Sequence, residues 1–341
     1  MIIVLKPNTN VEQIDDTEAR VQALGYEPRV IRGVERTIIA AVGDEISHES
    51  LQRLGRLAWV ESVTPIQKRY KLASREFHPT DSVVEVAGCK AGGGNLMTIA
   101  GPCSVESREQ LRAATKAIVA TGVRLIRGGA YKPRTSPYDF QGMGEAGLEL
   151  LAEIKEEFGV GIVTEIVGVT QVEQVAAVAD ILQVGARNCQ NYHLLEAIAG
   201  CGRAVLLKRG MATSVTEWIS AAEYLMVNGC ERVILCERGI RTFETSTRNT
   251  LDLNSVAVAK RETHLPVMVD PSHAAGKIDF VLPLAKAGIA VGADGLIVEV
   301  HPNPPEACSD AAQQIRAADF ATFMAALEPY FAIRAQEHAR G

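Results

Sequence analysis

Eight short apolar runs rich in Val, Ile and Leu recur along the middle and the C-terminal part of this chain. They begin near Met97, Val123, Gly161, Ile181, Ala204, Val233, Pro266 and Gly295. Runs of this length are typical of strands buried on both faces of a parallel sheet, and the segments between them are long enough for helices. The pattern therefore predicts an α/β fold, a (β/α)8 TIM barrel, for the larger part of the chain.

The first 66 residues show a different pattern. It predicts strands over 2–5 and 59–66, a β-hairpin over 29–42, and helices over 11–24 and 48–57. The order βαββαβ is that of a small ferredoxin-like α+β domain, and the segment contains no catalytic cluster. A polar stretch of mixed charge follows it. We therefore expect a ferredoxin-like domain over 1–66, a linker over 67–82 and a catalytic barrel over 83–341.

Composition narrows the class of protein. The chain has 341 residues, of which 47% are apolar and 22% charged, and its net charge is −6. These values are ordinary for a globular protein and disfavour general binding to nucleic acid or to membrane surfaces. No apolar run is long enough to predict a transmembrane helix, and the N-terminal segment does not resemble a signal peptide. The seven cysteines form no CxxC pair, which favours the reducing cytoplasm.

Most of the apolar runs end in residues that can carry chemistry. Because the strand C-termini of a TIM barrel meet at one mouth, where the active site lies, we expect these side chains to converge. Four of them are candidate metal ligands: Cys103, His273, Glu299 and Asp310. A thiolate, an imidazole and two carboxylates suit Mn²⁺, Fe²⁺ or Zn²⁺. Each residue alone also has a structural explanation, since a single Cys is often a small buried apolar residue.

Six cations also lie at or just after the ends of the runs: Arg127, Lys132, Arg134, Arg187, Lys208 and Arg238. Any one of them has an ordinary explanation as a surface salt bridge. Six cations meeting in an acidic chain would repel one another unless anions occupy the mouth. Since Arg and Lys bind phosphate and carboxylate, the set indicates substrates with more than one anionic group, most simply a phosphorylated small acid and a phosphorylated sugar.

Two other chemistries stay open at this point. Lys208, at the end of the fifth run, is placed to form the Schiff base of an aldolase. Glu165, at the end of the third run, is placed to act as a general base. The local sequence does not decide between these and a metal-assisted mechanism.

Six segments of the chain carry a resemblance to a known family: Ala100–Glu106, Gly128–Pro137, Gly185–Asn188, Leu207–Gly210, Asp270–His273 and Glu299–Pro302. In this order, across residues 83–330, they strongly resemble the 3-deoxy-D-arabino-heptulosonate 7-phosphate synthases. The first 66 residues resemble the regulatory extension of the subgroup that aromatic amino acids control.

The resemblance implies a metal-dependent transferase that condenses phosphoenolpyruvate with erythrose 4-phosphate, releases phosphate and opens the shikimate pathway. It places a divalent ion (Mn²⁺, Fe²⁺, Zn²⁺ or Co²⁺) on Cys103, His273, Glu299 and Asp310. By the same resemblance, phosphoenolpyruvate is bound by Arg127, Lys132, Lys208 and Arg238, with Gly185, Ala186 and Arg187 close to its phosphate. The aldose phosphate is bound by Arg134, Thr135 and Ser136. The candidate catalytic residues are Lys132 as proton donor to the new alkoxide, Glu165 as the residue that positions the attacking water, and His273.

Alternatives to this reading remain within and outside the superfamily. The 3-deoxy-octulosonate 8-phosphate synthases use arabinose 5-phosphate, typically carry a Lys-Ala-Asn-Arg-Ser-Ser loop where this chain has Lys132–Ser136, and normally lack the N-terminal extension. A catalytically silent effector-binding protein is disfavoured by the intact candidate metal ligands.

We expect the N-terminal domain to bind tyrosine or phenylalanine and to inhibit the barrel by docking near its mouth. The alternative role for this domain is oligomerisation. Members of the family are usually homotetramers.

Overall fold

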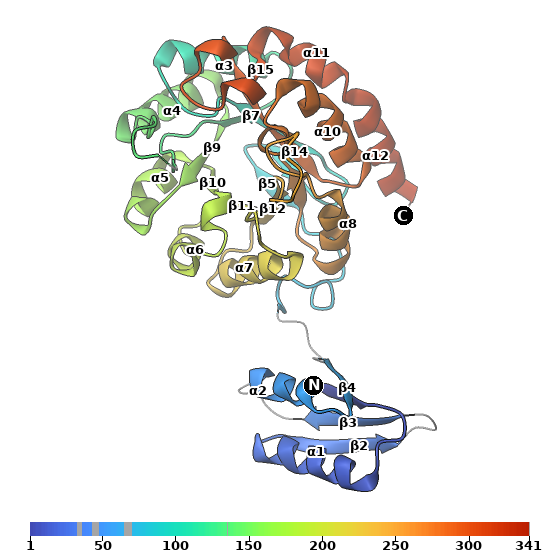
Figure 1. Cartoon of the computed structure of the whole chain (residues 1–341). Helices are drawn as coiled ribbons and strands as arrows, with labels where there is room; N and C mark the ends of the chain where they lie inside the picture. Colours follow the sequence, from blue (N-terminus) through green and yellow to red (C-terminus); the bar gives the residue numbers. More distant parts are fainter. Residues whose placement is uncertain (33–35, 43–47, 65–69, 135, 341) are drawn as a thin grey trace. The chain divides into compact units, whose positions relative to one another are not determined.

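The computed structural model describes residues 1–32, 36–42, 48–64, 70–134 and 136–340. The chain divides into two compact units, Met1–Arg69 and Tyr70–Gly341, and each is described by itself (Figure 1). Across the described residues, no helix combines the length and the apolar character needed to cross a membrane.

The N-terminal unit is a four-stranded antiparallel sheet with helices. Its elements are β1 (Ile2–Leu5), α1 (Val11–Ala23), β2 (Glu27–Arg32), β3 (Thr37–Val42), α2 (His48–Gln52), η2 (Arg53–Arg56) and β4 (Val60–Thr64). The strand order β2-β3-β1-β4 and the order βαββαβ confirm the predicted ferredoxin-like fold. A capping box of Asn10 and Gln13 begins α1, and its buried Ile14 and Val21 pack with Ile3 in the core of this unit.

The second unit is built on a closed parallel barrel (Figure 1). Its strands are β7 (Met97–Gly101), β8 (Leu125–Arg127), β9 (Gly161–Ile166), β10 (Ile181–Val184), β11 (Ala204–Lys208), β12 (Val233–Glu237), β13 (Val267–Val269) and β14 (Gly295–His301). Neighbours in sequence pair in parallel, and β14 pairs with both β13 and β7, which closes the ring. The predicted TIM barrel is confirmed, and it lies where the eight apolar runs placed it.

Helices cover the outside of the barrel. They are α3 (Arg108–Val119), α4 (Glu145–Phe158), α5 (Val172–Val178), α6 (Tyr192–Ala199), α7 (Val215–Val227), α8 (Leu253–Glu262), α9 (Pro271–Ala275), α10 (Ile278–Ala290), α11 (Phe320–Ala325) and α12 (Glu328–Arg340). Side chains of Ser107, Ser214 and Asp252 accept backbone hydrogen bonds at the starts of α3, α7 and α8, so polar residues after the strands define where these helices begin. A continuous apolar core fills the space between strands and helices.

One end of the barrel is closed by a small hairpin, β5 (Val84–Val86) and β6 (Cys89–Ala91). Val84 and Val86 belong to the same buried cluster as Met97 and Leu125, which lie at the starts of β7 and β8. The N-terminal ends of the strands are therefore covered, and the C-terminal ends are left to form a site.

The described part of the predicted linker over 67–82 packs onto the barrel unit. The hydroxyl of Tyr70 donates to Glu262 on α8, and the backbone N–H groups of Leu72 and Ala73 donate to Glu223 on α7. Tyr70 and Ala73 are buried. In the structure the division of the chain falls after Arg69, and Tyr70 and Ala73 belong to the buried core of the barrel unit. Residues 67–69 lie outside the described part.

Candidate active site

The chemistry-bearing residues meet at the C-terminal mouth of the barrel, around a cavity of about 310 Å³. Its lining includes Arg127, Lys132, Arg134, Glu165, Gly185, Ala186, Arg187, Lys208, Arg238, His273 and Asp310. Cys103 and Glu299 lie buried behind this surface, next to Asp310 and His273. The convergence expected from the strand ends is therefore observed for these residues.

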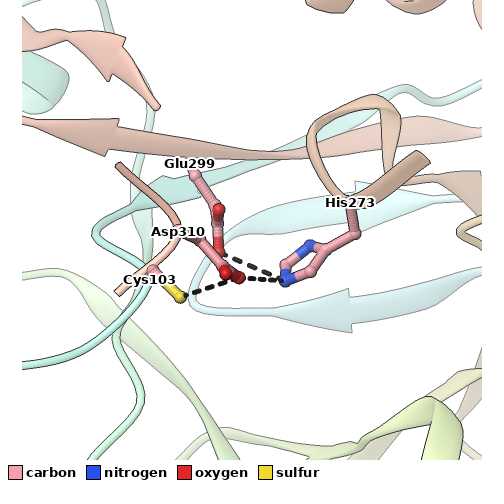
Figure 2. Close-up of side chains that lie close together, drawn as sticks. All are labelled: Cys103, His273, Glu299 and Asp310. Atoms are coloured by element: carbon pink, nitrogen blue, oxygen red, sulfur yellow. Dashed lines mark hydrogen bonds and ion pairs between the residues drawn. The ribbon is translucent and has the colours of Figure 1, made fainter. Parts of the chain in front are cut away.

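Four side chains at one side of the mouth form a compact cluster (Figure 2). One ligand atom from each of Cys103, His273, Glu299 and Asp310 lies within 4.8 Å of the others. Nε2 of His273 is 3.3 Å from Oε1 of Glu299 and 3.7 Å from Oδ2 of Asp310. The thiol of Cys103 is 3.4 Å from the same Asp310 oxygen. A soft sulfur, an imidazole and two hard oxygens at this spacing are a donor set for a divalent transition metal.

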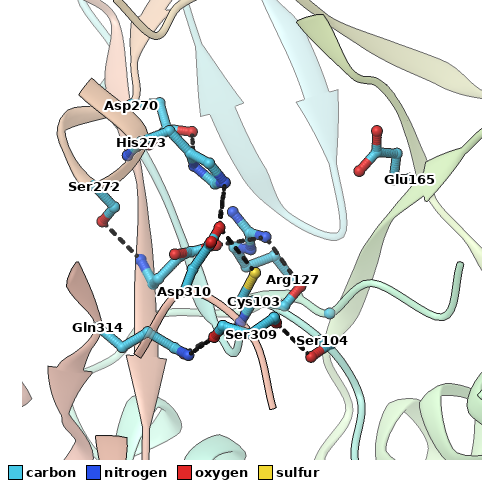
Figure 3. Close-up of polar contacts among 12 residues, drawn as sticks. Cys103, Ser104, Arg127, Glu165, Asp270, Ser272, His273, Ser309, Asp310 and Gln314 are labelled. Carbon is cyan, nitrogen blue, oxygen red and sulfur yellow. Dashed lines mark hydrogen bonds and ion pairs between the residues drawn. The ribbon is translucent and has the colours of Figure 1, made fainter. Parts of the chain in front are cut away.

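The orientation of His273 follows from Asp270, which comes directly after β13 and is the N-cap of α9 (Figure 3). One oxygen of Asp270 accepts the backbone N–H of His273 at 2.9 Å, and the other accepts Nδ1–H at 2.7 Å. The second bond fixes the tautomer, so Nε2 faces the cluster with its lone pair. The same Asp270 oxygen also pairs with Lys208.

Burial sets the protonation of the cluster. It raises the pKa of the Cys103 thiol to about 12, and the nearby Glu299 carboxylate adds to this effect. It lowers the pKa of His273, so the imidazole is neutral at neutral pH. Burial disfavours the charged forms of Glu299 and Asp310. The imidazole of His273, followed by Arg127 at Glu299 and Arg248 at Asp310, more than offsets this effect, and both pKa values fall.

One buried oxygen in the cluster accepts no hydrogen bond from any described residue. It is Oε1 of Glu299, whose nearest cation is Nη2 of Arg127 at 3.2 Å. The other oxygen of Glu299 is occupied by the side-chain amide of Gln313 at 2.6 Å. A buried carboxylate oxygen left without a donor is costly. A metal ion held by these ligands would satisfy it, so the residues present fit such an ion.

The cations surround the cavity at different depths. Arg127 is buried, and its Nε and Nη1 have no hydrogen-bond partner among the described residues. Nζ of Lys132 is 3.2 Å from the sulfur and 3.2 Å from the carbonyl oxygen of Cys103. Arg238 is also buried, and burial lowers its pKa. Arg187 is exposed at the rim. Buried guanidinium groups with free N–H donors are poised to bind anions.

The loop after β8 was predicted to hold the sugar phosphate. Arg134 lines the cavity and pairs loosely with Asp139 at 3.4 Å. Ser136 is half-buried in the same loop but does not appear among the described residues that line the cavity. Thr135 lies outside the described residues, so the structure says nothing of its predicted role.

Glu165 lies across the cavity from the metal-ligand cluster, on β9 (Figure 3). Its Oε2 accepts a long hydrogen bond of 3.5 Å from the amide of Gln183, the neighbour on β10. A Cβ at Gly185 would stand 2.0 Å from its Oε1. Glycine is therefore required at position 185 if Glu165 is to keep this place.

The structure adds residues that the sequence did not single out. Arg241, Arg248 and Asn249 line the cavity from the long loop between β12 and α8. The length and polarity of this loop are the sequence signals that could have pointed to these residues. Glu237 anchors both of its ends, because one carboxylate oxygen accepts the N–H groups of Gly239 at 2.7 Å and of Asp252 at 3.4 Å.

Comparisons with known proteins match both units of the chain. The model of the DAHP synthetase I family matches residues 73–334, and that of the DAHP synthase ferredoxin-like domain matches residues 1–68. A phospho-2-dehydro-3-deoxyheptonate aldolase of Thermotoga maritima is 47% identical over 95% of this chain and 94% of its own. A 2-dehydro-3-deoxyphosphooctonate aldolase of an Azoarcus species is 35% identical over 63% of this chain and 83% of its own.

Solved structures give the same picture. The crystal structure of the Thermotoga maritima DAHP synthase superposes with a TM-score of 0.89 at 45% identity, covering 98% of both chains. A truncated form of the enzyme from the same organism superposes with a TM-score of 0.73 and covers 77% of this chain and 97% of its own. With a family model matching most of its length and a relative this similar across both units, the chain belongs to the DAHP synthetase I family.

Proposed function

We propose that the mouth of the barrel holds a divalent metal ion, phosphoenolpyruvate and erythrose 4-phosphate together, with the roles given below. As a member of its family, the protein condenses the two substrates to 3-deoxy-D-arabino-heptulosonate 7-phosphate and phosphate, the first step of the shikimate pathway. The observation that carries the proposal is a cavity rich in cations directly beside a cluster of four metal-ligand side chains.

The metal ligands in this proposal are Cys103, His273, Glu299 and Asp310, and the ion is Mn²⁺, Fe²⁺, Zn²⁺ or Co²⁺. When bound, the ion polarises the aldehyde oxygen of the sugar as a Lewis acid. The chain supplies the rest. Asp270 holds His273 in the tautomer that can bind a metal, and the mixed donor set favours a transition metal over Mg²⁺ or Ca²⁺.

Phosphoenolpyruvate is held by the buried cations Arg127, Lys132, Lys208 and Arg238, with Gly185, Ala186 and Arg187 next to its phosphate. The unpaired N–H groups of Arg127 support this assignment, since they need an acceptor. Fixed cations around both anionic groups hold C3 towards the aldehyde and stabilise the phosphate as the C–O bond at C2 breaks.

The aldose phosphate is bound by the loop Arg134–Ser136, with Arg134 as its cation. Two proton-handling roles complete the site. Lys132, whose Nζ lies against Cys103, is placed to give a proton to the new alkoxide. Glu165, on the opposite wall of the cavity, is placed to orient the water that attacks C2.

A phosphate-release assay tests the proposal. The full-length protein is given phosphoenolpyruvate with either erythrose 4-phosphate or arabinose 5-phosphate, before and after chelation. We expect turnover with erythrose 4-phosphate, loss of it on chelation and recovery with Mn²⁺. Full activity after chelation, or trapping of substrate on Lys208 by borohydride, would favour a Schiff-base mechanism instead. Preference for arabinose 5-phosphate would contradict the sugar assignment.

The N-terminal unit has a regulatory role in this proposal. It binds an aromatic amino acid, tyrosine or phenylalanine, and inhibits the barrel. Its compact fold and the absence of a group of metal-ligating side chains among its described residues support this role. A protein that begins at Tyr70 keeps the segment that packs on α7 and α8, and it should retain activity and lose inhibition. Inhibition of this shortened protein would place the effector site on the barrel.

The proposed assembly is a homotetramer, and the proposed location is the cytoplasm. Sedimentation in solution tests the oligomeric state.

A further inference from the structure

Arg248 occupies an unusual place between the metal-ligand cluster and the cavity. Its Nη1 lies 3.2 Å from Oδ2 of Asp310 and donates to the side-chain oxygen of Gln313 at 3.1 Å. The same side chain lines the cavity and is 40% exposed to solvent. A guanidinium group therefore already pairs with a carboxylate oxygen that the proposed metal site needs.

The backbone around Arg248 is tied to the helix that carries His273. The N–H of Arg248 donates to the carbonyl of Ala275 at 3.1 Å, and the N–H of Asn249 donates to that of Ala274 at 2.9 Å. The side-chain amide of Asn249 adds a bond to the carbonyl of His273 at 3.0 Å. A Cβ at Gly276, where φ is +68°, would stand 2.5 Å from Cβ of Arg248. The starting point of the Arg248 side chain is therefore fixed, and only its outer part can change partners.

Asp310 cannot serve two cations equally well. Its Oδ2 is also the atom that approaches Cys103 and His273, at 3.4 and 3.7 Å. A divalent ion bound there takes up the negative charge that now neutralises Arg248. The freed guanidinium then lies beside a like charge, in a cavity that already contains many cations, and it needs an anion.

We propose that Arg248 couples metal binding to aldose-phosphate binding: it pairs with Asp310 in the metal-free protein and with the phosphate of the aldose once Asp310 binds the ion. The inference rests on the proposed function, in which the anionic groups of phosphoenolpyruvate already have four buried cations and the aldose phosphate has Arg134. Such coupling is reciprocal, so the metal strengthens binding of the aldose phosphate and the aldose phosphate strengthens binding of the metal by the same factor.

The test measures Mn²⁺ affinity by calorimetry on full-length Arg248→Met, first without substrates and then with erythrose 4-phosphate alone, which cannot react. We expect Arg248→Met to bind Mn²⁺ about fivefold more tightly than the wild type, the size of a partly exposed ion pair. Its KM for erythrose 4-phosphate should rise roughly tenfold or more, while its KM for phosphoenolpyruvate changes little. Erythrose 4-phosphate should tighten Mn²⁺ binding in the wild type and leave it unchanged in Arg248→Met.

The matched control is Arg241→Met, which removes a cation from the same loop and cavity; within the described part of the chain, Arg241 forms no ion pair with the four ligands. Its Mn²⁺ affinity should equal that of the wild type. Weaker Mn²⁺ binding by Arg248→Met would show that Arg248 only supports the cluster, and would overturn the inference. So would an unchanged KM for erythrose 4-phosphate. Failure of the wild type to bind Mn²⁺ would instead contradict the proposed function.

Discussion

Removing the charge of Glu237 tests whether a buried ion pair outside the cavity holds the active-site loop. Glu237 is fully buried and accepts from Nη1 of Arg209 at 2.9 Å and from the hydroxyl of Ser255 at 3.1 Å, in addition to the two backbone N–H groups that begin and end the loop. Glu237→Gln keeps the shape of the side chain. It removes the charge and turns an NH₂ group towards donors, which leaves at least one of them unsatisfied.

The expected cost follows from these contacts. Breaking a buried ion pair by removing one partner typically costs about 3–5 kcal/mol. Arg209 keeps a second partner, Asp252 at 2.8 Å, so we expect about 2–3 kcal/mol for Glu237→Gln. For a domain of this size that lowers the Tm of the barrel by about 5 °C. Because Arg238 and the loop beyond it lose their anchor, kcat/KM should fall about tenfold, with most of the change in KM for the aldose phosphate.

Calorimetric unfolding and steady-state kinetics measure the two effects. The matched control is Glu157→Gln, which removes a carboxylate that pairs with Arg112 on the exposed surface of the same unit. Exposed pairs contribute less than about 1 kcal/mol, so Glu157→Gln should change neither quantity appreciably. An unchanged Tm for Glu237→Gln would refute the energetic argument. A lower Tm with unchanged kinetics would show that the anchor stabilises the fold without placing the loop.

The other predictions concern the cluster and the walls of the cavity. Cys103→Ala should abolish metal binding and turnover and leave the folded circular dichroism spectrum intact; retained metal stoichiometry would remove Cys103 from the ligand set. Because the pKa of this thiol is raised to about 12 in the metal-free protein, binding as thiolate releases a proton, and Mn²⁺ affinity in the wild type should rise with pH past about 9, where an ordinary thiol would level off. Gly185→Ala should displace Glu165 and lower kcat about 100-fold with folding unaffected; near-normal kcat would show that Glu165 has no fixed task. Arg134→Ala should raise KM for erythrose 4-phosphate roughly 10- to 150-fold, since a charged hydrogen bond contributes about 1.5–3 kcal/mol, and an unchanged KM would contradict the loop assignment.

The barrel could be predicted from the sequence because the buried strands and the reactive side chains at their ends occur in the same repeating pattern. Parallel strands with helices on one side and a packed interior on the other are apolar throughout, so each appears as an uninterrupted run that ends where a reactive side chain enters the mouth. This rule placed Arg127, Glu165 and Lys208 directly at strand ends, where the structure has them. Even the three-residue strands β8 and β13 were detectable by their apolar runs.

What the sequence missed depends on contacts between distant segments. The proposed role of Arg248 rests on a loop whose backbone donates hydrogen bonds to Ala274 and Ala275 of α9, and an arginine in a polar loop has no pattern of its own. The side-chain amide of Gln313 donates a hydrogen bond to Glu299, but a glutamine in a sequence rarely indicates a functional site. The packing of Tyr70 and Ala73 on α7 and α8 could not be predicted either, because it joins distant segments and the surrounding stretch is polar. Such roles become visible only when the fold brings the partners together.

Three carboxylates that surround His273 also explain how so many cations can share one cavity before any substrate binds. From the sequence we expected bound anions to relieve the repulsion among six cations. In the structure, carboxylates of the protein already pair with two of the six, Asp270 with Lys208 and Glu299 with Arg127, and Asp310 pairs with a further cation of the cavity, Arg248. Each carboxylate also contacts His273. If the proposed metal ion binds at these oxygens, its charge also changes the electrostatic energy of the cations that the proposed function assigns to substrates. The proposed function therefore predicts that metal and substrate binding are energetically coupled, because the same oxygens neutralise both.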